Sequence, residues 1–377
     1  MIYTIGKVTT LIGARRYGDR DCNIGFILTD SRSLCFPEET LFFALKSGRN
    51  DGQNYIPELY RRGVRNFVVM EIPKGYASDY PDANFLKVVN VLEALQRLAE
   101  RHRDEFNIPI VGITGSNGKT IVKEWLYQLL SPNMYVTRSP RSYNSQIGVP
   151  LSVWLMNEQT QVGVFEAGIS QPGEMLALRD IIQPTIAVLT NLGTAHQENF
   201  ESMESKCREK LVLFHDAETI VYSMDDPIIR KVVDSYDYKG EKLAWSEKDT
   251  KAPMYVKAIE KDNDHTTIRY IFQGHEGFYS LPFIDEASVV NSITVSVIAL
   301  KLGVTSGALK ERMAMLEPVA MRLEVKEGQH GCTLINDSYN SDVNSLDIAL
   351  DFMNRRPDHK GDRKSTRLNS SHRCLSR

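Results

Sequence analysis

Short apolar runs alternate with helical patterns over the first hundred residues. A helical pattern at 55–62 lies between the second and third of the apolar runs, which occupy 24–28, 41–45 and 64–70. This alternation predicts a small α/β unit. A longer helix is predicted from Val88 to about Phe106, because apolar side chains recur there at intervals of three and four. Pro109 requires that helix to end before it.

From residue 110 onward the pattern becomes strand, glycine-rich turn and helix. The strand is predicted at 110–113, and the helix begins near Lys119 with its apolar side chains in one stripe. Further strand-like runs follow at 162–165, 186–190 and 219–222, with helical stretches between them. A parallel sheet with covering helices is therefore predicted for this block.

The pattern changes again after residue 250. A polar, strand-rich section at 254–283 precedes helices predicted from near Ala287 and at 306–315, and Pro318 then breaks the pattern. A strand at 332–335 begins a third unit. We expect an α/β chain with an N-terminal domain at 1–105, a central parallel-sheet domain at 106–318, and the start of an incomplete, Rossmann-like third domain at 319–361.

The last sixteen residues fit none of these patterns. Residues 362–377 are polar and basic and lack helical or strand periodicity. Residues 362–372 can be encoded by a DNA sequence that resembles a widely used sequencing adapter read in frame. We expect 362–377 to be adapter read-through and the natural sequence to stop near Gly361. Without this segment, 40 basic and 47 acidic residues give a net charge of −7.

Composition excludes several classes of protein. The 377 residues are 42% hydrophobic, which excludes disordered and collagen-like chains, and the length suggests two or three domains. The net charge of −3 disfavours nonspecific nucleic-acid binding. The five scattered cysteines form no zinc-binding or disulfide pattern, which favours the cytoplasm. Without a signal-peptide pattern or a long apolar segment, neither secretion nor membrane insertion is expected.

The strongest chemical signal is the segment Gly112-Ile-Thr-Gly-Ser-Asn-Gly-Lys-Thr120 between a predicted strand and a predicted helix. Glycines and a helix N-terminus direct backbone N–H groups toward a phosphate, a lysine can reach the outer phosphates, and a threonine hydroxyl can bind Mg²⁺. The strict P-loop pattern would need glycine where Ile113 stands. The candidate nucleotide-binding residues are Gly112, Thr114, Gly115, Ser116, Asn117, Gly118, Lys119 and Thr120.

This loop resembles the ATP loop of the Mur ligase family and of the related folylpolyglutamate synthase. Further segments match the same family in order, at 144–150, 166–174, 190–198 and 210–214. The resemblance extends over essentially the whole chain to Gly361. It implies an ATP-dependent ligase, with a uridine-nucleotide-binding first domain, a central ATP-binding domain and a third ligase domain.

The resemblance assigns Mg²⁺ ligands that the residues alone leave open. It implies Glu166, His196 and Thr120 as ligands, and Lys210 as a lysine carbamylated by CO₂, with Lys206 a weaker candidate for that role. Without the resemblance, Glu166 could be a solvated carboxylate at the edge of the sheet, and a lone histidine such as His196 is more often a structural residue than a metal ligand. A surface helix lysine is the favoured interpretation of Lys210 by itself.

Substrate residues are also implied by the resemblance. Asn291 and Arg322 match positions near the adenine nucleotide. Asn144 and Asn191 could orient neighbouring groups or the nucleotide, although asparagine near a strand end is also common turn chemistry. Ser31, Arg32 and Asp51 resemble the uridine-nucleotide site, where Arg32 could pair with a diphosphate. Ordinary turns at Asp30–Arg32 and Asp51–Gly52 are equally compatible with the local sequence.

The third unit separates members of the family. Asp337, Tyr339 and Asn340 resemble the member that joins D-alanyl-D-alanine to a UDP-N-acetylmuramoyl-tripeptide. Another Mur ligase, a folylpolyglutamate synthase-like ligase and a non-catalytic ATP-binding module are the alternatives. The resemblance implies ATP and Mg²⁺ as cofactors and a monomer, unless the chain is the front part of a fusion with alanine racemase.

Overall fold

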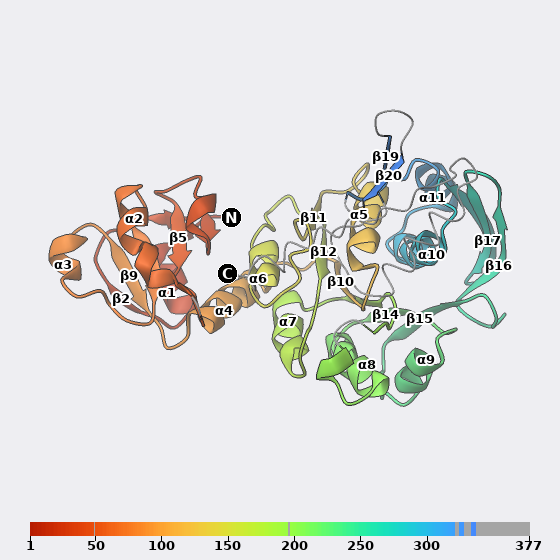
Figure 1. Cartoon of the computed structure of the whole chain (residues 1–377), viewed down its shortest axis with the longest axis horizontal. Coiled ribbons are helices and arrows are strands. Elements are labelled where there is room, and N and C mark those ends of the chain that lie inside the picture. The colour runs from red at the N-terminus through yellow and green to blue at the C-terminus, as the bar shows by residue number, and fades with distance from the viewer. Residues whose placement is uncertain (49, 195–196, 321–323, 328–332, 337–377) are drawn as a thin grey trace. The chain divides into compact units, whose positions relative to one another are not determined.

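The computed structural model describes residues 1–48, 50–194, 197–320, 324–327 and 333–336 (Figure 1). The chain divides into two compact units. Unit 1 comprises residues 1–112, 135–169 and 173–185, and unit 2 comprises 113–134, 170–172 and the chain from 186. The domain boundaries expected near 105 and 318 stay predictions.

A five-stranded sheet lies at the N-terminal end of unit 1. Its order is β2 (Arg15–Tyr17), β9 (Asn84–Lys87), β8 (Asn66–Val69), β5 (Thr40–Phe43), β4 (Phe26–Leu28). The last four strands are parallel, and β2 is antiparallel to β9. The predicted small α/β unit is thereby confirmed.

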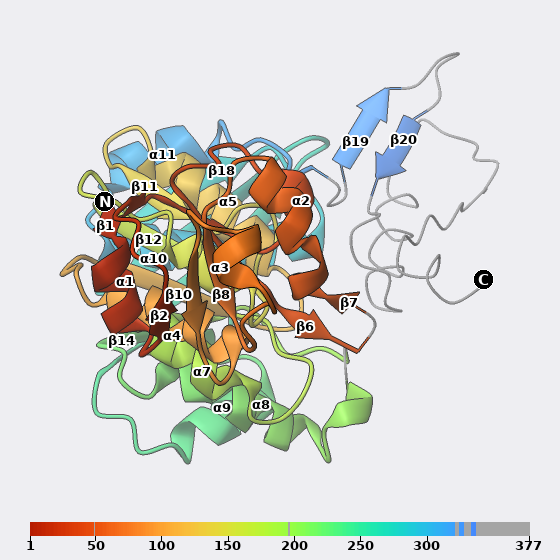
Figure 2. The ribbon, with the colours of Figure 1, turned by 90° about the vertical axis from the view of Figure 1, so that its left-hand side faces the viewer.

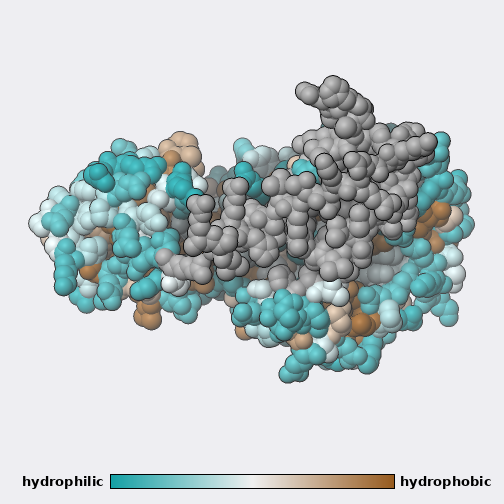
Figure 3. Space-filling model, in the orientation of Figure 1, coloured by the Kyte–Doolittle hydropathy of each residue, from teal (hydrophilic) through white to brown (hydrophobic). Residues whose placement is uncertain are grey.

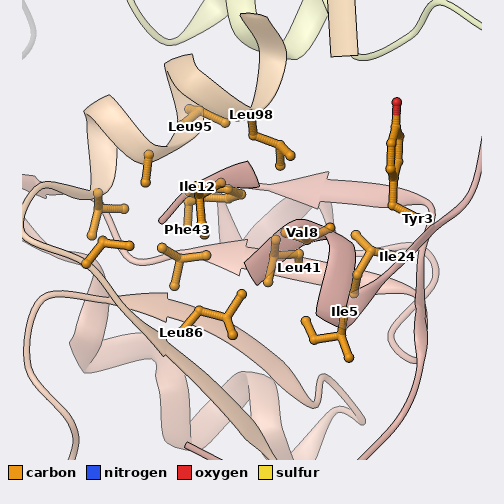
Figure 4. Packing of buried hydrophobic residues seen from close by; sticks show 14 of the residues in the cluster. Tyr3, Ile5, Val8, Ile12, Ile24, Leu41, Phe43, Leu86, Leu95 and Leu98 are labelled. Atoms are coloured by element: carbon orange, nitrogen blue, oxygen red, sulfur yellow. The ribbon is translucent and has the colours of Figure 1, made fainter. Parts of the chain in front are cut away.

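Two hydrophobic clusters cover the two faces of this sheet. Leu41 and Phe43 belong to the cluster that includes α1 (Ile5–Leu11) and α4 (Val91–Arg103), as Figure 4 shows. Phe42, between them in sequence, belongs to the cluster that includes α2 (Ile56–Arg61). Successive side chains of a strand point to opposite faces, so the apolar run 41–45 marks a strand buried on both sides.

The rest of unit 1 surrounds the α4 helix. This helix packs against α6 (Gly148–Val153) and α7 (Glu174–Ile182), and β11 (Val136–Arg138) pairs in parallel with β12 (Val162–Glu166). The first residues of β10 (Ile110–Thr114) lie beside β12, since the Gly163 N–H donates to the Pro109 carbonyl. The shorter elements of unit 1 are β1 (Tyr3–Thr4), β3 (Asn23–Ile24), β6 (Lys46–Ser47), β7 (Asn50–Asp51), α3 (Tyr76–Asp79) and the 3₁₀ turns Ser31–Ser33 and Gly52–Tyr55.

His102 of α4 is a buried titratable group in this region. One ring nitrogen lies 2.8 Å from the Tyr3 hydroxyl, the other lies 3.1 Å from the Met156 carbonyl, and the ring packs on Trp154. Burial lowers the pKa of His102 to about 4, although the hydrogen bond to the Met156 carbonyl opposes the shift. The neutral imidazole is therefore the form that fits this site.

Acid is expected to destabilise the protein through His102. Its folded-state pKa lies below its unfolded value of 6.5, so its contribution is complete above pH 6.5 and is lost as the pH falls toward 4. The loss is on the order of 3 kcal/mol. Urea unfolding of wild type and His102→Gln at several pH values isolates this contribution, because other titrating groups are common to both proteins. Equal pH dependence in the two proteins would contradict the expectation.

In unit 2, parallel and antiparallel strands belong to one sheet. β13 (Ile186–Leu189), β14 (Thr219–Ser223), β15 (Glu241–Ser246) and the start of β16 (Met254–Lys261) pair in parallel. The antiparallel strands β17 (Thr266–Phe272) and β18 (His275–Leu281) then extend the sheet. The strands predicted at 186–190 and 219–222 and the strand-rich section at 254–283 are thus confirmed.

Helices connect and cover these strands. α5 (Lys119–Leu130), α10 (Glu286–Lys301) and α11 (Ser306–Met313) match the predicted helices, and α5 packs against α10. The remaining elements are α8 (Met203–Leu211), α9 (Pro227–Asp234), β19 (Glu324–Glu327), β20 (Thr333–Asn336) and the 3₁₀ turns Gln197–Asn199 and Val212–Phe214. Figure 2 shows β19 and β20 as an antiparallel pair.

The C-terminal half of α5 is fixed to the chain that follows α11. The Trp125 indole N–H donates to the Glu317 carbonyl at 3.0 Å, and the Trp125 ring stacks on Phe283. Gln128 accepts from the Glu317 N–H at 2.9 Å, and Arg312 of α11 donates to the Leu129 carbonyl. These contacts hold the helix that begins at the glycine-rich loop.

Hydrophilic side chains predominate on the coloured part of the face in Figure 3. Exposed large hydrophobic residues are scattered, and Val89 and Met315 are examples. Within the described residues, every helix is too short or too polar to cross a membrane.

Candidate nucleotide-binding site

The glycine-rich loop joins β10 to α5 in unit 2. Gly115 has φ +145° and Gly118 has φ +82°, which are conformations that residues with a side chain rarely adopt. A Cβ atom on Gly115 would overlap the Thr190 hydroxyl oxygen, and one on Gly118 would overlap the amide oxygen of Asn291. Glycine is therefore required at both positions by conformation and by space.

The residues after β13 hold the loop in place. The Thr190 N–H donates to the Thr114 carbonyl at 3.0 Å, so the end of β13 lies beside the end of β10. The Ser116 N–H donates to the Asn191 carbonyl at 3.1 Å, and the Asn117 N–H donates to the Asn191 side-chain oxygen at 2.9 Å. The Asn191 side-chain amide donates a hydrogen bond to the Asn117 carbonyl at 3.1 Å. Neighbouring parallel strands thus place the loop at the carboxyl edge of the sheet, where α/β proteins bind ligands.

Three lysines meet around this loop. The Lys119 ammonium lies 2.8 Å from the Gly115 carbonyl and 3.1 Å from that of Ser116. Lys210 of α8 reaches the same Gly115 carbonyl at 3.2 Å, and Lys206 donates to the Gly193 carbonyl at 2.7 Å. The cluster brings basic side chains to the loop, which suits a polyphosphate.

The surface position favoured for Lys210 from the residue alone was wrong. Lys206 and Lys210 are each 2% exposed, because one side of α8 packs onto the loop and α9. Burial, and then the charges of Lys119 and Lys206, lower the pKa of Lys210 well below its ordinary value. The spacing of four residues places both lysines on one face of the helix, but only the packing shows that this face is buried.

Glu166 and Asn144 form a second polar group, within unit 1. Glu166 is the last residue of β12 and is fully buried, so a solvated edge carboxylate is excluded. The Glu166 N–H donates to the Ser139 hydroxyl at 3.2 Å, and the Asn144 side-chain amide donates to the Glu166 carboxylate at 3.4 Å. Gly168 lies so close that a Cβ atom would come 2.9 Å from the Asn144 amide carbon. Asn144 thus orients the carboxylate.

The candidate substrate residues of the N-terminal part of unit 1 lie at two 3₁₀ turns, Ser31–Ser33 after β4 and Gly52–Tyr55 after β7. Asp30 caps the turn Ser31–Ser33, and its carboxylate pairs with the exposed Arg32 guanidinium at 2.6 Å. Asp51 accepts the Gln53 N–H at 3.0 Å. Both turns that the local sequence allowed are present; the first follows the carboxyl end of the parallel strand β4, and the second follows the antiparallel β6–β7 hairpin.

Several predicted residues lie outside the described part of the chain. They are His196, Arg322, Asp337, Tyr339 and Asn340. Asn291 is described and is buried on α10 beside Gly118. Among the described residues, no group of three or more His, Cys, Asp or Glu side chains could hold a metal ion.

Sequence reasoning gave no structural role to Thr190 and only a general one to Asn191. Thr190 donates its hydroxyl to the Asn117 carbonyl at 2.5 Å, and Asn191 makes the bonds that fix Ser116 and Asn117. The available signal was their position directly after a buried strand, next to the strand that leads into the glycine-rich loop.

A glycine-rich loop between a parallel strand and a helix, with lysines around it, defines a nucleotide-binding α/β protein of the P-loop type. Residues 113–299 match the family model described as the Mur ligase middle domain. This family model and the relatives below support a Mur ligase of the MurF type.

Individual relatives agree with this assignment. The UDP-N-acetylmuramoyl-tripeptide–D-alanyl-D-alanine ligase of Bacillus subtilis is 27% identical over 341 residues, which cover 86% of this chain and 69% of the relative. The crystal structure of MurF ligase from Thermotoga maritima in complex with ADP has a TM-score of 0.75 at 26% identity, over 87% of this chain and 74% of that one. MurF from Acinetobacter baumannii shares the fold, with a TM-score of 0.84 at 23% identity over 94% of this chain and 77% of that one.

Proposed function

We infer that the protein is an ATP-dependent ligase that adds D-alanyl-D-alanine to UDP-N-acetylmuramoyl-tripeptide during peptidoglycan precursor synthesis. The observation that carries this inference is the glycine-rich loop, with its three lysines, in a chain of the MurF type. Relatives that align with 86% or more of the chain carry the name of this ligase. The expected compartment is the cytoplasm.

The reaction joins two substrates through an activated acid. The terminal carboxylate of the tripeptide attacks the γ-phosphorus of ATP, which releases ADP and gives an acyl phosphate. The amine of D-alanyl-D-alanine then attacks the acyl carbon, phosphate leaves with the bonding electron pair, and the amine loses a proton. Negative charge develops on the transferred phosphoryl group, and in this proposal Lys119 stabilises it; the position of its ammonium against the Gly115 carbonyl supports that role. No nucleophilic side chain is required.

The first test is the substrate dependence of phosphate release. We expect release of inorganic phosphate from ATP only when the muramoyl tripeptide and D-alanyl-D-alanine are both present. Release that depends on glutamate and a folate would identify a folylpolyglutamate synthase instead. ATP binding without phosphate release under any of these conditions would indicate a non-catalytic ATP-binding module.

The substrate residues are assigned as follows in this proposal. The loop Gly112–Thr120 holds the ATP phosphates, and Asn291 and Arg322 approach the adenine nucleotide. Ser31, Arg32 and Asp51 contact the uridine nucleotide, while Asn144 orients the neighbouring carboxylate. The dipeptide residues are Asp337, Tyr339 and Asn340. Support comes from the left-handed glycines that shape the loop and from the close approach of Asn291 to Gly118.

Mg²⁺ is the cation that fits the donors of this proposal. The hydroxyl of Thr120 and the carboxylate of Glu166 are hard oxygen ligands, and His196 would add a nitrogen. Lys210 can join them only as a carbamate, which forms when its neutral amine attacks the carbon of CO₂ and the nitrogen loses a proton. Mg²⁺ bound there would neutralise the charge that develops on the transferred phosphoryl group.

Lys210→Ala is expected to reduce ligation at least a hundredfold, which corresponds to about 3 kcal/mol. Short carboxylic acids such as acetate should restore part of the activity, because they supply the missing anionic oxygens. Lys206→Ala is the comparison variant, because it removes the other buried lysine of α8; rescue of Lys206→Ala in place of Lys210→Ala would assign the carbamate to Lys206. The measurement is kcat as a function of acetate concentration. Absence of rescue at Lys210 would count against carbamylation.

Oligomeric state and fusion stay predictions of this proposal. A monomer is expected unless the gene continues into an alanine racemase. The genomic sequence downstream of Gly361 tests the fusion and the origin of residues 362–377 together.

A further inference from the structure

A cavity of about 420 Å³ lies in unit 1 at the amino edge of the five-stranded sheet. Pro37 and Glu38 precede β5, Gly63 and Arg65 precede β8, Arg62 follows α2, and Arg20 follows the antiparallel β2. The candidate substrate turn at Ser31 follows the carboxyl end of β4, and Asp51 ends the short β6–β7 hairpin. The cavity lining therefore lies mostly at the opposite edge of the sheet from the Ser31 turn, with Arg62 reaching toward it.

Arg65 and Arg20 are held in position by residues that do not line the cavity. Arg65 donates from Nε to Asp82 at 2.7 Å and from Nη1 to the Tyr60 carbonyl at 2.8 Å, and its guanidinium lies over the Tyr60 ring. Arg20 reaches the same Asp82 carboxylate at 3.3 Å. Asp82 is not among the lining residues, so it orients the two guanidinium groups without filling the cavity.

The third arginine joins the cavity to a substrate turn. Arg62 Nη1 donates to the Ser31 carbonyl at 2.8 Å and to Glu58 at 3.2 Å. Within the described chain, no hydrogen-bond partner is found for Nη2 of Arg65 or for Nε and Nη2 of Arg20 and Arg62. Five N–H-bearing nitrogens from three cations thus remain available around one cavity.

We propose that this cavity binds a small phosphorylated molecule. Three cationic side chains and one carboxylate, Glu38, line it, so the lining favours an anion although Asp82 and Glu58 lie behind it. Guanidinium groups match phosphate oxygens in pairs, and Glu38 can accept a hydroxyl of the same ligand. A cavity of this size exceeds a single phosphate, which favours a diphosphate or a phosphorylated sugar. Through Arg62, the bound molecule would also stabilise the Ser31 turn.

Hydrogen exchange of the full chain with inorganic pyrophosphate as the probe tests this proposal. We expect slower amide exchange at residues 36–41 and 60–66, increasing with pyrophosphate concentration. Arg62→Gln and Arg20→Gln should each weaken the apparent affinity at these segments about tenfold or more. Arg61→Gln should leave it unchanged, because Arg61 is exposed on the same helix and is not a lining residue.

Slower amide exchange at residues 112–120 would indicate pyrophosphate binding at the glycine-rich loop, and it is measured separately from exchange at the cavity. Protection confined to 112–120, or equal protection by sodium chloride at matched ionic strength, would overturn the proposal and leave the proposed ligase function intact. Protection at 60–66 that survives both arginine substitutions would also overturn it. Thermal unfolding without pyrophosphate confirms that each variant is folded. Loss of ligase activity with the cavity signal retained would concern the proposed function alone.

Discussion

Replacing Lys119 by Met is expected to lower kcat for ligation by about three orders of magnitude, or about 4 kcal/mol. The Lys119 ammonium lies against two loop carbonyls at the N-terminus of α5, where the outer phosphates of a nucleotide would lie. The charge of the transferred phosphoryl group grows in the transition state, so loss of the ammonium should affect kcat more than the KM for ATP. Steady-state phosphate release at saturating substrates measures this difference.

Lys257→Met is the matched control for this variant. Lys257 pairs with Glu276 on the surface of the antiparallel strands, so its removal deletes the same charge away from the loop. Its kcat should stay within about twofold of wild type. A Lys119→Met enzyme that retains more than a tenth of wild-type kcat would show that this ammonium does not stabilise the transferred phosphoryl group.

Gly115→Ala is expected to weaken ADP binding about a hundredfold or more. At φ +145° the alanine would carry strain on the order of 1–3 kcal/mol, and its Cβ would overlap the Thr190 hydroxyl. The Thr190 and Asn191 contacts that fix the loop would have to give way. Together these effects reach about 3 kcal/mol, which corresponds to two orders of magnitude in affinity. Isothermal titration calorimetry with ADP measures it.

Gly274→Ala is the control that introduces backbone strain without displacing the glycine-rich loop. Gly274 has φ +85° in the hairpin between β17 and β18, and no heavy atom lies within 4 Å of the position of its added Cβ. This variant should lose about 1 kcal/mol of stability and keep wild-type ADP affinity. ADP binding by Gly115→Ala within threefold of wild type would mean that the loop tolerates the displacement.

The sequence predicted local elements more reliably than burial. Helix α5 was expected from Lys119, where it begins, because the glycines before it and the apolar stripe after it are local signals. The burial of Lys206 and Lys210 is not local, since it depends on how α8 packs after the chain has left β13. A lysine is usually exposed, so only the tertiary structure could assign these two to the loop.

In the candidate site, too, some features follow from the local sequence and others depend on the tertiary structure. The glycines and Lys119 were identified from a motif whose geometry follows from its residue types. The part played by Thr190 and Asn191 could not be derived in this way, because hydrogen bonds between the ends of two strands depend on strand order. Strand order is set by packing of the whole sheet, which single-strand patterns do not encode.

The clamping of α5 at both ends affects the entropy of nucleotide binding. Asn191 holds the loop before the helix, and Glu317 and Arg312 hold its C-terminal half. Ordering a flexible loop on association would cost about 1–2 kcal/mol for each backbone residue fixed. Because folding has already ordered this loop, nucleotide association should show only a small unfavourable conformational entropy, and the affinity should depend mainly on electrostatic attraction and therefore on salt.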